Sequence, residues 1–223
     1  MNVSTGVVLA GGEGRRLRPL TTNRPKPLLP AGNRPILEHV LDTLLEINIQ
    51  RIIIVVGYRR KRIQQHFGPS YRDTPIEYVT QESELGSGHA LLQARNHVSG
   101  PFVVLNGDRI IGQEILADVT NTFTERGVPT IAAMEHPEAH TFGAVTLDNG
   151  RVTDLVEKPQ SGQYQLINAG VYGLTLDIFD TLAETPMHEG ELALPTTIGH
   201  RIERGDPVYG IQRDALWTDA TFP

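Results

Sequence analysis

An apolar run near the start of the chain ends in glycines and then in basic residues, which strongly limits the folds available. Residues 7–10 are apolar, and residues 11–16 contain three glycines followed by two arginines. A continuous apolar run of this kind indicates a buried strand. Glycines let the backbone approach a ligand closely and direct N–H groups at it. With Lys26 between two prolines ten residues after Arg16, the segment predicts a strand that leads into a polyphosphate cradle.

Strand-like and helical patterns alternate through the first half of the chain. Strands are predicted at residues 7–10, 52–56, 76–80 and 102–105. Helices are predicted between them at residues 36–47, 59–67 and 87–97. This β-α-β order predicts an α/β fold with a doubly wound, mostly parallel sheet of Rossmann-like type flanked by helices.

The second half is richer in strands and indicates that the sheet is mixed. Strands are predicted at residues 129–134, 143–147, 152–157, 167–174 and 208–211, and helices at residues 177–182 and 194–204. Residues 148–150, Asp-Asn-Gly, have the composition of a hairpin turn. Since no repeat or Pro/Ser-rich linker interrupts the chain, residues 1–223 are predicted to form a single domain.

Composition excludes several classes of function. The chain has no cysteine, which rules out disulfides, thiolate catalysis and cysteine metal sites. A net charge of −6 argues against a broad nucleic-acid surface, so any anion site must be a local cluster of cations. The N-terminus does not resemble a signal peptide, and no apolar run approaches the ~20 residues of a membrane span. We therefore expect a cytoplasmic protein without nucleic-acid or membrane partners.

The glycine segment fits neither of two common nucleotide-binding motifs. A dinucleotide fingerprint that starts at Gly12 would need a third glycine where Leu17 stands, and no acidic residue directly follows the second predicted strand. A P-loop needs Gly-Lys-Ser or Gly-Lys-Thr, which the chain lacks. These departures disfavour a dinucleotide-binding oxidoreductase and a P-loop enzyme.

Polar residues follow several predicted strands, at the edge where an open parallel sheet binds ligands. Gln81 follows the third strand, Asp108 the fourth, and Glu157 ends a later one. A carboxylate such as Asp108 suits Mg²⁺, which takes one or two carboxylates together with phosphate oxygens. The alternative is that residues 106–108, Asn-Gly-Asp, form only a turn.

The order of motifs resembles the sugar nucleotidylyltransferase family. The matching segments are G-x-G-x-R-L-x-P-L from Gly12, P-K-P-L-L-P from Pro25, G-D at residues 107–108, E-K-P from Glu157, N-A-G-V-Y from Asn168 and W-x-D-x-T from Trp217. The resemblance extends from residue 7 to residue 221. It implies an enzyme that joins a nucleoside triphosphate to a sugar 1-phosphate, with a nucleotide-binding half at about residues 1–110 and a sugar-binding half at about residues 111–223.

The resemblance also implies roles for residues near the glycine loop. Nucleotide-binding positions correspond to Leu9, Ala10, Gly11, Gly12, Gly14 and Arg15, the last replacing the family's common threonine. Arg16 would hold the departing pyrophosphate, and Lys26 would bridge the α-phosphate and the sugar phosphate. Asp108 and Asp219 would hold Mg²⁺. Because Lys26 is expected on a polar loop, its loss should affect catalysis more than stability.

The segment from Gln81, Q-x-x-x-L-G-S-G-H-A, resembles the base-binding segment of bacterial N-acetylglucosamine-1-phosphate uridylyltransferases. It implies that Gln81 and Gly86 contact a pyrimidine, so that UTP or dTTP is the expected nucleotide. Alternatively, Gly86 only shapes the start of the next helix, with Ser87 as its N-cap. Enzymes that make GDP-mannose share the opening motif, so a mannose-1-phosphate guanylyltransferase stays open.

The sugar side is implied by four residues of the second half. Gly143, Glu157, Lys158 and Asn168 would contact glucose 1-phosphate or N-acetylglucosamine 1-phosphate; for the Glu-Lys pair the alternative is a solvated strand end. A catalytically silent nucleotide-sugar-binding regulatory subunit is disfavoured because the catalytic lysine and both aspartates are present. Family members normally continue past Asp219, so we expect a shortened chain in which Asp219 is loosely held. A homo-oligomer is possible.

Overall fold

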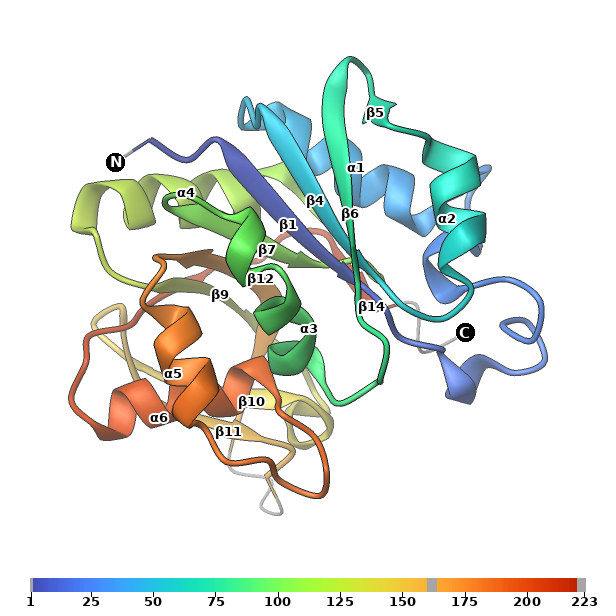
Figure 1. The fold of residues 1–223 in the computed structure, drawn as a ribbon. Helices are drawn as coiled ribbons and strands as arrows, with labels where there is room; N and C mark the ends of the chain where they lie inside the picture. The colour runs from blue at the N-terminus through green and yellow to red at the C-terminus, as the bar shows by residue number, and fades with distance from the viewer. Residues whose placement is uncertain (1, 160–163, 220–223) are drawn as a thin grey trace.

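A ten-stranded sheet forms the centre of the protein, which a computed structural model describes at residues 2–159 and 164–219 (Figure 1). The strand order is β10-β11-β13-β9-β12-β7-β1-β4-β6-β5. Its parallel part contains β6 (Thr74–Thr80), β4 (Arg51–Val56), β1 (Thr5–Ala10) and β7 (Phe102–Asn106). Val8 pairs with Ile54 on one side and Leu105 on the other, and all three are buried, as expected for a central parallel strand.

The remaining strands make the sheet mixed, as the sequence predicts. Strand β12 (Leu166–Leu174) is antiparallel to both β7 and β9 (Thr130–Glu135). Beyond β9 come β13 (Tyr209–Gln212), β11 (Arg151–Glu157) and β10 (Gly143–Asp148), while β5 (Ser70–Tyr71) lies at the opposite edge. Strands β10 and β11 form the predicted hairpin around residues 149–150.

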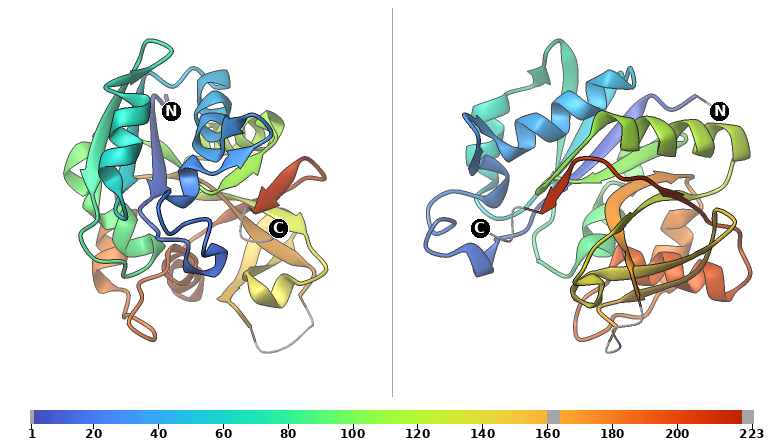
Figure 2. Two further views of the ribbon diagram at one scale, coloured as in Figure 1. Left: turned by 90° about the vertical axis from the view of Figure 1, so that its right-hand side faces the viewer. Right: turned by 180° about the vertical axis from the view of Figure 1, so that it is seen from behind.

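Helices cover both faces of the sheet and enclose two apolar cores (Figures 1 and 2). One face carries α1 (Ile36–Glu46), α2 (Arg60–Phe67) and α4 (Gln113–Arg126). The other carries α3 (Ser87–Gln93), α5 (Ile178–Glu184) and α6 (Leu194–Glu203). The doubly wound α/β fold is therefore confirmed. None of these helices is long and apolar enough to cross a membrane.

The sequence analysis missed one long helix and two small ribbons. Helix α4, 14 residues long, packs against β9 and β12. Strand β8 (Arg109–Ile111) pairs with β14 (Trp217–Asp219), and β2 (Pro30–Ala31) pairs with β3 (Arg34–Pro35). The β8–β14 ribbon brings residues from the middle and the end of the chain to the carboxyl edge of β7.

Candidate functional site

A cleft of about 500 Å³ opens at the carboxyl ends of β1 and β7. It brings together all the residues that the sequence analysis assigned to nucleotide, catalysis or metal. These are Leu9, Ala10, Gly11, Gly12, Gly14, Arg15, Arg16, Lys26, Gln81, Gly86, Asp108 and Asp219. The cleft therefore lies at the edge where an open α/β sheet binds ligands.

A second chamber of about 170 Å³ adjoins the cleft and contains the four residues predicted to bind the sugar. These are Gly143, Glu157, Lys158 and Asn168. Arg16, Arg109 and Asp219 line both spaces, so the chamber and the cleft are continuous. A ligand with two parts could therefore extend from one into the other.

The glycine loop is fixed at two of its glycines and open at the third. Gly14 has a left-handed backbone with φ of 66°, and its carbonyl accepts a hydrogen bond from Thr21 at 2.9 Å. A Cβ atom at Gly11 would lie 2.6 Å from Oε1 of Gln81, so a larger residue there would displace the Gln81 side chain. A Cβ at Gly12 would meet no protein atom within 4 Å. The loop is thus held on its protein side while the Gly12 backbone faces space that a ligand can reach.

Lys26 is the most constrained cation of the cleft. It begins a short 3₁₀ turn, Lys26–Leu28, and its side chain is only 8% exposed. Its Nζ donates to Oδ2 of Asp108 at 2.7 Å and to Oδ1 of Asp219 at 3.2 Å. The sequence analysis expected a polar loop here; the side chain is instead buried, and the two carboxylates offset the cost of burying the ammonium group.

Asp219 is also held more firmly than expected. It ends β14, pairs in register with Arg109 of β8, and its side chain is 9% exposed. Its Oδ2 lies 3.6 Å from Nε of Arg109. Ribbon pairing and two cations fix this carboxylate, contrary to the expectation of a loosely held residue. Ala220 and Thr221, the last positions of the family motif, lie outside the described residues.

The two aspartates form a donor set that fits Mg²⁺. Both carboxylates reach the same nitrogen of Lys26, so they can also reach one cation. Carboxylate oxygens are ligands that Mg²⁺ prefers. Its remaining ligands are usually water molecules and phosphate oxygens. Within residues 2–159 and 164–219 no group of three or more His, Cys, Asp or Glu side chains could hold a metal. The fit therefore requires ligands from a bound phosphate or from water.

Gln81 is buried and has a fixed orientation. Its Nε2 donates to the Gly86 carbonyl at 3.2 Å and lies 3.0 Å from Nδ1 of His89. In the His89 tautomer with an unprotonated Nδ1, both hydrogens of the amide nitrogen are used, which leaves Oε1 to accept from a ligand. Gly86 has φ of 98°, and a Cβ there would lie 2.4 Å from the Leu192 carbonyl oxygen. The Gly86 carbonyl therefore holds the Gln81 amide in place, and the backbone conformation that presents this carbonyl requires glycine.

Ser87 does not cap α3 as the alternative interpretation expects. The helix begins at Ser87, Gly86 stands at the N-cap position, and no side chain caps it. Instead, Oγ of Ser87 accepts a hydrogen bond from the Leu194 backbone at 3.0 Å. Ser87 therefore joins the starts of α3 and α6 beside the cleft.

In the second chamber, Glu157 is a carboxyl group whose pKa is shifted by its surroundings. Burial raises the pKa of its carboxyl above the usual value, while Lys158 and Arg109 partly counteract the shift. Nζ of Lys158 lies 3.9 Å away, but its side chain is 62% exposed. Asn168 is buried, with its amide nitrogen donating to the Tyr172 hydroxyl at 2.7 Å and its Oδ1 accepting from Gly170. Asn168 therefore lines the chamber while shaping β12.

Several lining residues were missed by the sequence analysis. Asn106, Arg109 and Glu191 border both spaces, and Glu84 borders the cleft. Burial raises the pKa of Glu84. Arg109 directly follows Asp108, so an extra cation beside a candidate metal ligand was a usable signal. Glu191 comes from a stretch without a predicted element, and nothing in its sequence neighbourhood indicates its position.

Known proteins match this chain over almost its whole length. The family model for nucleotidyl transferases matches residues 5–220. The bifunctional protein GlmU of Methanococcus vannielii is 36% identical over 225 residues, covering 97% of this chain and 52% of that protein. The UTP–glucose-1-phosphate uridylyltransferase AglF of Haloferax volcanii is 34% identical, covering 97% of this chain and 91% of that protein. The chain spans about half the length of the GlmU relatives.

Solved structures share the fold. A UDP-glucose pyrophosphorylase complexed with UDP-glucose has a TM-score of 0.89 at 23% identity, covering 99% of this chain and 94% of that one. A structure from Bacillus anthracis, described as a glucose-1-phosphate thymidylyltransferase in complex with sucrose, has a TM-score of 0.89 at 25% identity, covering 97% and 89%. The fold, the motif order and the family match over residues 5–220 agree, and the chain belongs to the nucleotidyl transferase family.

Proposed function

We propose that this protein transfers a nucleotidyl group from a pyrimidine nucleoside triphosphate, UTP or dTTP, to a sugar 1-phosphate. The sugar is glucose 1-phosphate or N-acetylglucosamine 1-phosphate, and pyrophosphate is released. The observation that carries the proposal is the continuity of the two spaces, with Arg16 and Asp219 lining both. A nucleotide in the cleft and a sugar in the chamber would meet at this junction. The relative AglF, which is named as a UTP–glucose-1-phosphate uridylyltransferase, supports it.

The reaction needs positioning and charge neutralisation rather than a covalent intermediate. An oxygen of the sugar phosphate attacks the α-phosphorus in line, and pyrophosphate leaves on the opposite side. Arg16 and the backbone N–H groups near Gly12 hold the leaving pyrophosphate, and Lys26 holds the α-phosphate between the substrates. Members of the family generally use a divalent metal, and Mg²⁺ held by Asp108 and Asp219 would offset negative charge on the phosphates.

The fixed orientation of Gln81 supports a choice of base. An acceptor at Oε1 matches the N3–H of uracil or thymine, whereas the matching ring nitrogens of cytosine and adenine are acceptors. Guanine also has a ring N–H, so GTP is the informative competitor.

An enzyme that consumes these nucleotides is proposed to act in the cytoplasm. Homo-oligomers are compatible with this proposal.

Pyrophosphate release on a panel of substrates tests the proposed function. Each of UTP, dTTP, GTP, CTP and ATP is mixed with glucose 1-phosphate, N-acetylglucosamine 1-phosphate or mannose 1-phosphate in the presence of Mg²⁺. We expect release with UTP or dTTP and one of the first two sugars, and none with CTP or ATP. Release only with GTP and mannose 1-phosphate would favour the guanylyltransferase instead. Binding of a nucleotide sugar without any turnover would favour the silent subunit.

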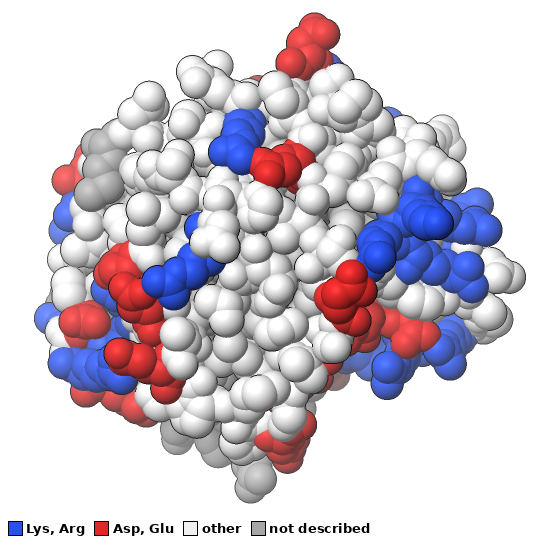
Figure 3. Space-filling model, viewed as in Figure 1, with Lys and Arg blue, Asp and Glu red and all other residues white. Residues whose placement is uncertain are grey.

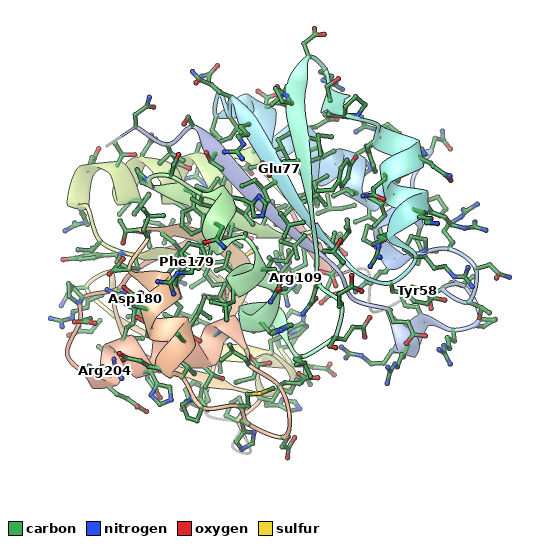
Figure 4. All side chains as sticks on the ribbon, in the orientation of Figure 1. Tyr58, Glu77, Arg109, Phe179, Asp180 and Arg204 are labelled. Atoms are coloured by element: carbon green, nitrogen blue, oxygen red, sulfur yellow. The ribbon has the colours of Figure 1, made fainter. Side chains whose placement is uncertain are left out.

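Variants of aspartate connect the activity to this site. Asp108→Ala should abolish pyrophosphate release at saturating Mg²⁺ while the far-UV circular dichroism stays unchanged. Asp180→Ala is the matched control, since Asp180 lies on α5 with a 70% exposed side chain and is well separated from Arg109 in Figure 4. Near-normal turnover by Asp108→Ala would remove Asp108 from the proposed mechanism.

A further inference from the structure

Arg109 lies at the junction between the cleft and the chamber, near the centre of the view in Figure 4. Among the described lining residues, Arg16 and Arg109 are the two cations that border both spaces. Arg16 lies on the exposed glycine loop, whereas the Arg109 side chain is only 16% exposed. Arg109 is therefore the more enclosed of the two cations.

The Arg109 guanidinium is held in place from several sides. Its Nη1 donates to the Asn168 carbonyl at 3.0 Å, and its Nε lies 3.6 Å from Asp219. The group lies over the rings of Phe142 and Trp217, with centroid distances of 5.8 and 5.5 Å. Aromatic faces stabilise a cation that has lost part of its water. The guanidinium is therefore fixed before any ligand binds.

The backbone of β12 leaves room for this arrangement. Gly170 has a left-handed φ of 81°, and a Cβ atom there would lie 2.8 Å from Nη1 of Arg109. Only glycine combines this backbone with such close approach to the guanidinium. The register of β12 with β9 shifts between Asn168 and Tyr172, and the Asn168 carbonyl at the start of this irregular stretch accepts from Arg109.

We propose that Arg109 binds the phosphate of the sugar 1-phosphate and orients it toward the nucleotide. This inference rests on the proposed function and names the residue that receives the second substrate. A guanidinium has five donors in a planar fork that matches phosphate, and the contacts with Asn168 and Asp219 do not use all of them.

The other cations nearby are less suited to this task. Lys26 is engaged by two carboxylates, and the Lys158 side chain is 62% exposed, so it keeps much of its conformational freedom. A fixed, desolvated donor binds a dianion more tightly than a solvated one, because less ordering is needed on binding. Arg109 also contacts Asp219, so binding of the sugar phosphate to Arg109 would affect the orientation of the Asp219 carboxylate.

The chain contains a built-in reporter for this test. Trp217 is the only tryptophan, and its ring lies 5.5 Å from the Arg109 guanidinium. Its fluorescence can be titrated with glucose 1-phosphate, N-acetylglucosamine 1-phosphate or inorganic phosphate, without nucleotide or metal. We expect a saturable response in the wild-type protein, at least a tenfold weaker midpoint in Arg109→Met, and an intermediate value in Arg109→Lys. No saturable response in the wild type would overturn the proposal.

Arg126→Met is the matched control. Arg126 lies 4.0 Å from the Tyr209 ring centroid, so the control also removes an arginine stacked on an aromatic ring, but it borders neither the cleft nor the chamber. Its titration midpoint should equal that of the wild type. An unchanged midpoint in Arg109→Met would refute the proposal without affecting the proposed function.

Steady-state kinetics separate a binding role from a structural one. Loss of a charge-assisted hydrogen bond costs about 1.5–3 kcal/mol, so Arg109→Met should raise the KM for the sugar 1-phosphate roughly 10- to 150-fold. The KM for the nucleotide should stay within about twofold. Equal rises in both KM values with a lower melting temperature would assign Arg109 a purely structural role. If no sugar phosphate is turned over, the proposed function fails, and the fluorescence titration still decides whether Arg109 binds phosphate.

Discussion

Burial of Lys26 between Asp108 and Asp219 shows how single residues prepare the cleft for anions. The ammonium group offsets part of the charge of two carboxylates that would otherwise repel a phosphate, and they in turn keep Lys26 at the carboxyl end of β7. A bound triphosphate would offer a partner of opposite charge to the Lys26 ammonium group, and a bound cation would offer one to the two carboxylates. The sequence predicted that these three residues matter but not that they contact one another, since they are separated by 82 and 193 positions.

A substitution of Glu157 tests the charge state of the chamber. Because burial raises the pKa of Glu157, the folded protein binds a proton more readily there than the unfolded chain does. Its ionised form therefore destabilises the fold above the raised pKa, and this cost disappears as the pH falls below the unfolded value. Glu157→Gln should raise the melting temperature at pH 7.5, by on the order of 2–4 °C for each ~1 kcal/mol of ionisation cost that it removes.

Thermal melts from pH 4 to pH 8 provide the measurement. The gain of Glu157→Gln should shrink as the pH is lowered, while Glu125→Gln, at an exposed position of α4, should show no such trend. The same Glu157 variant should bind sugar 1-phosphate more weakly, because a carboxylate accepts stronger hydrogen bonds from hydroxyls than an amide does. A lower melting temperature at every pH would contradict the assigned cost of ionisation.

At the scale of elements, α4 shows why the local sequence was insufficient to predict every helix. Its buried residues Ile115, Leu116, Val119 and Phe123 do follow helical spacing. Between them stand Thr120, Asn121 and Thr122, which have low helix propensity. Packing on β9 and β12 stabilises the helix where its intrinsic preference is weak. Strands β1, β4 and β7 were predicted correctly because their apolar runs are buried on both faces, while β6 was predicted although it is only partly buried.

The contact between α4 and β12 can be tested at Gly173. A Cβ atom there would lie 2.6 Å from Cγ of Phe123 and 2.8 Å from its Cβ, with the ring already fully buried. Gly173→Ala should therefore destabilise the fold by about 1–3 kcal/mol in urea unfolding, as overpacking does elsewhere. Gly100→Ala is the control, since a Cβ there meets no atom within 4 Å, and it should change stability by at most ~0.5 kcal/mol. Equal stability of the two variants would contradict the packing observed here.

At the scale of the whole molecule, the two proposed halves share one sheet. Strands β7 and β12 join them directly, and one apolar core contains residues from both sides of this junction. Charge is distributed less evenly. Basic side chains gather over α2 and the loop after β1 in Figure 3, although the chain has a net charge of −6. A local concentration of cations can attract phosphates without making the whole surface basic.

The shared sheet predicts cooperative unfolding. Far-UV circular dichroism reports all the helices and strands, whereas fluorescence of Trp217 reports the β8–β14 ribbon beside the cleft. We expect the two urea transitions to coincide within experimental error, because separating the halves would break the β7–β12 ladder. A fluorescence transition at clearly lower urea would show that the ribbon opens independently.

The sequence by itself determined the central strands of the sheet, the glycine loop and the family, because short-range periodicity and consecutive motif residues carry that information. It also determined which residue types would gather at the strand ends, since parallel strands place these ends on one edge. Only the tertiary structure decided that Lys26 is buried, that Asp219 is held in a ribbon, and that Arg109 faces both spaces. These properties depend on contacts between residues far apart in the chain, and no local pattern encodes such contacts.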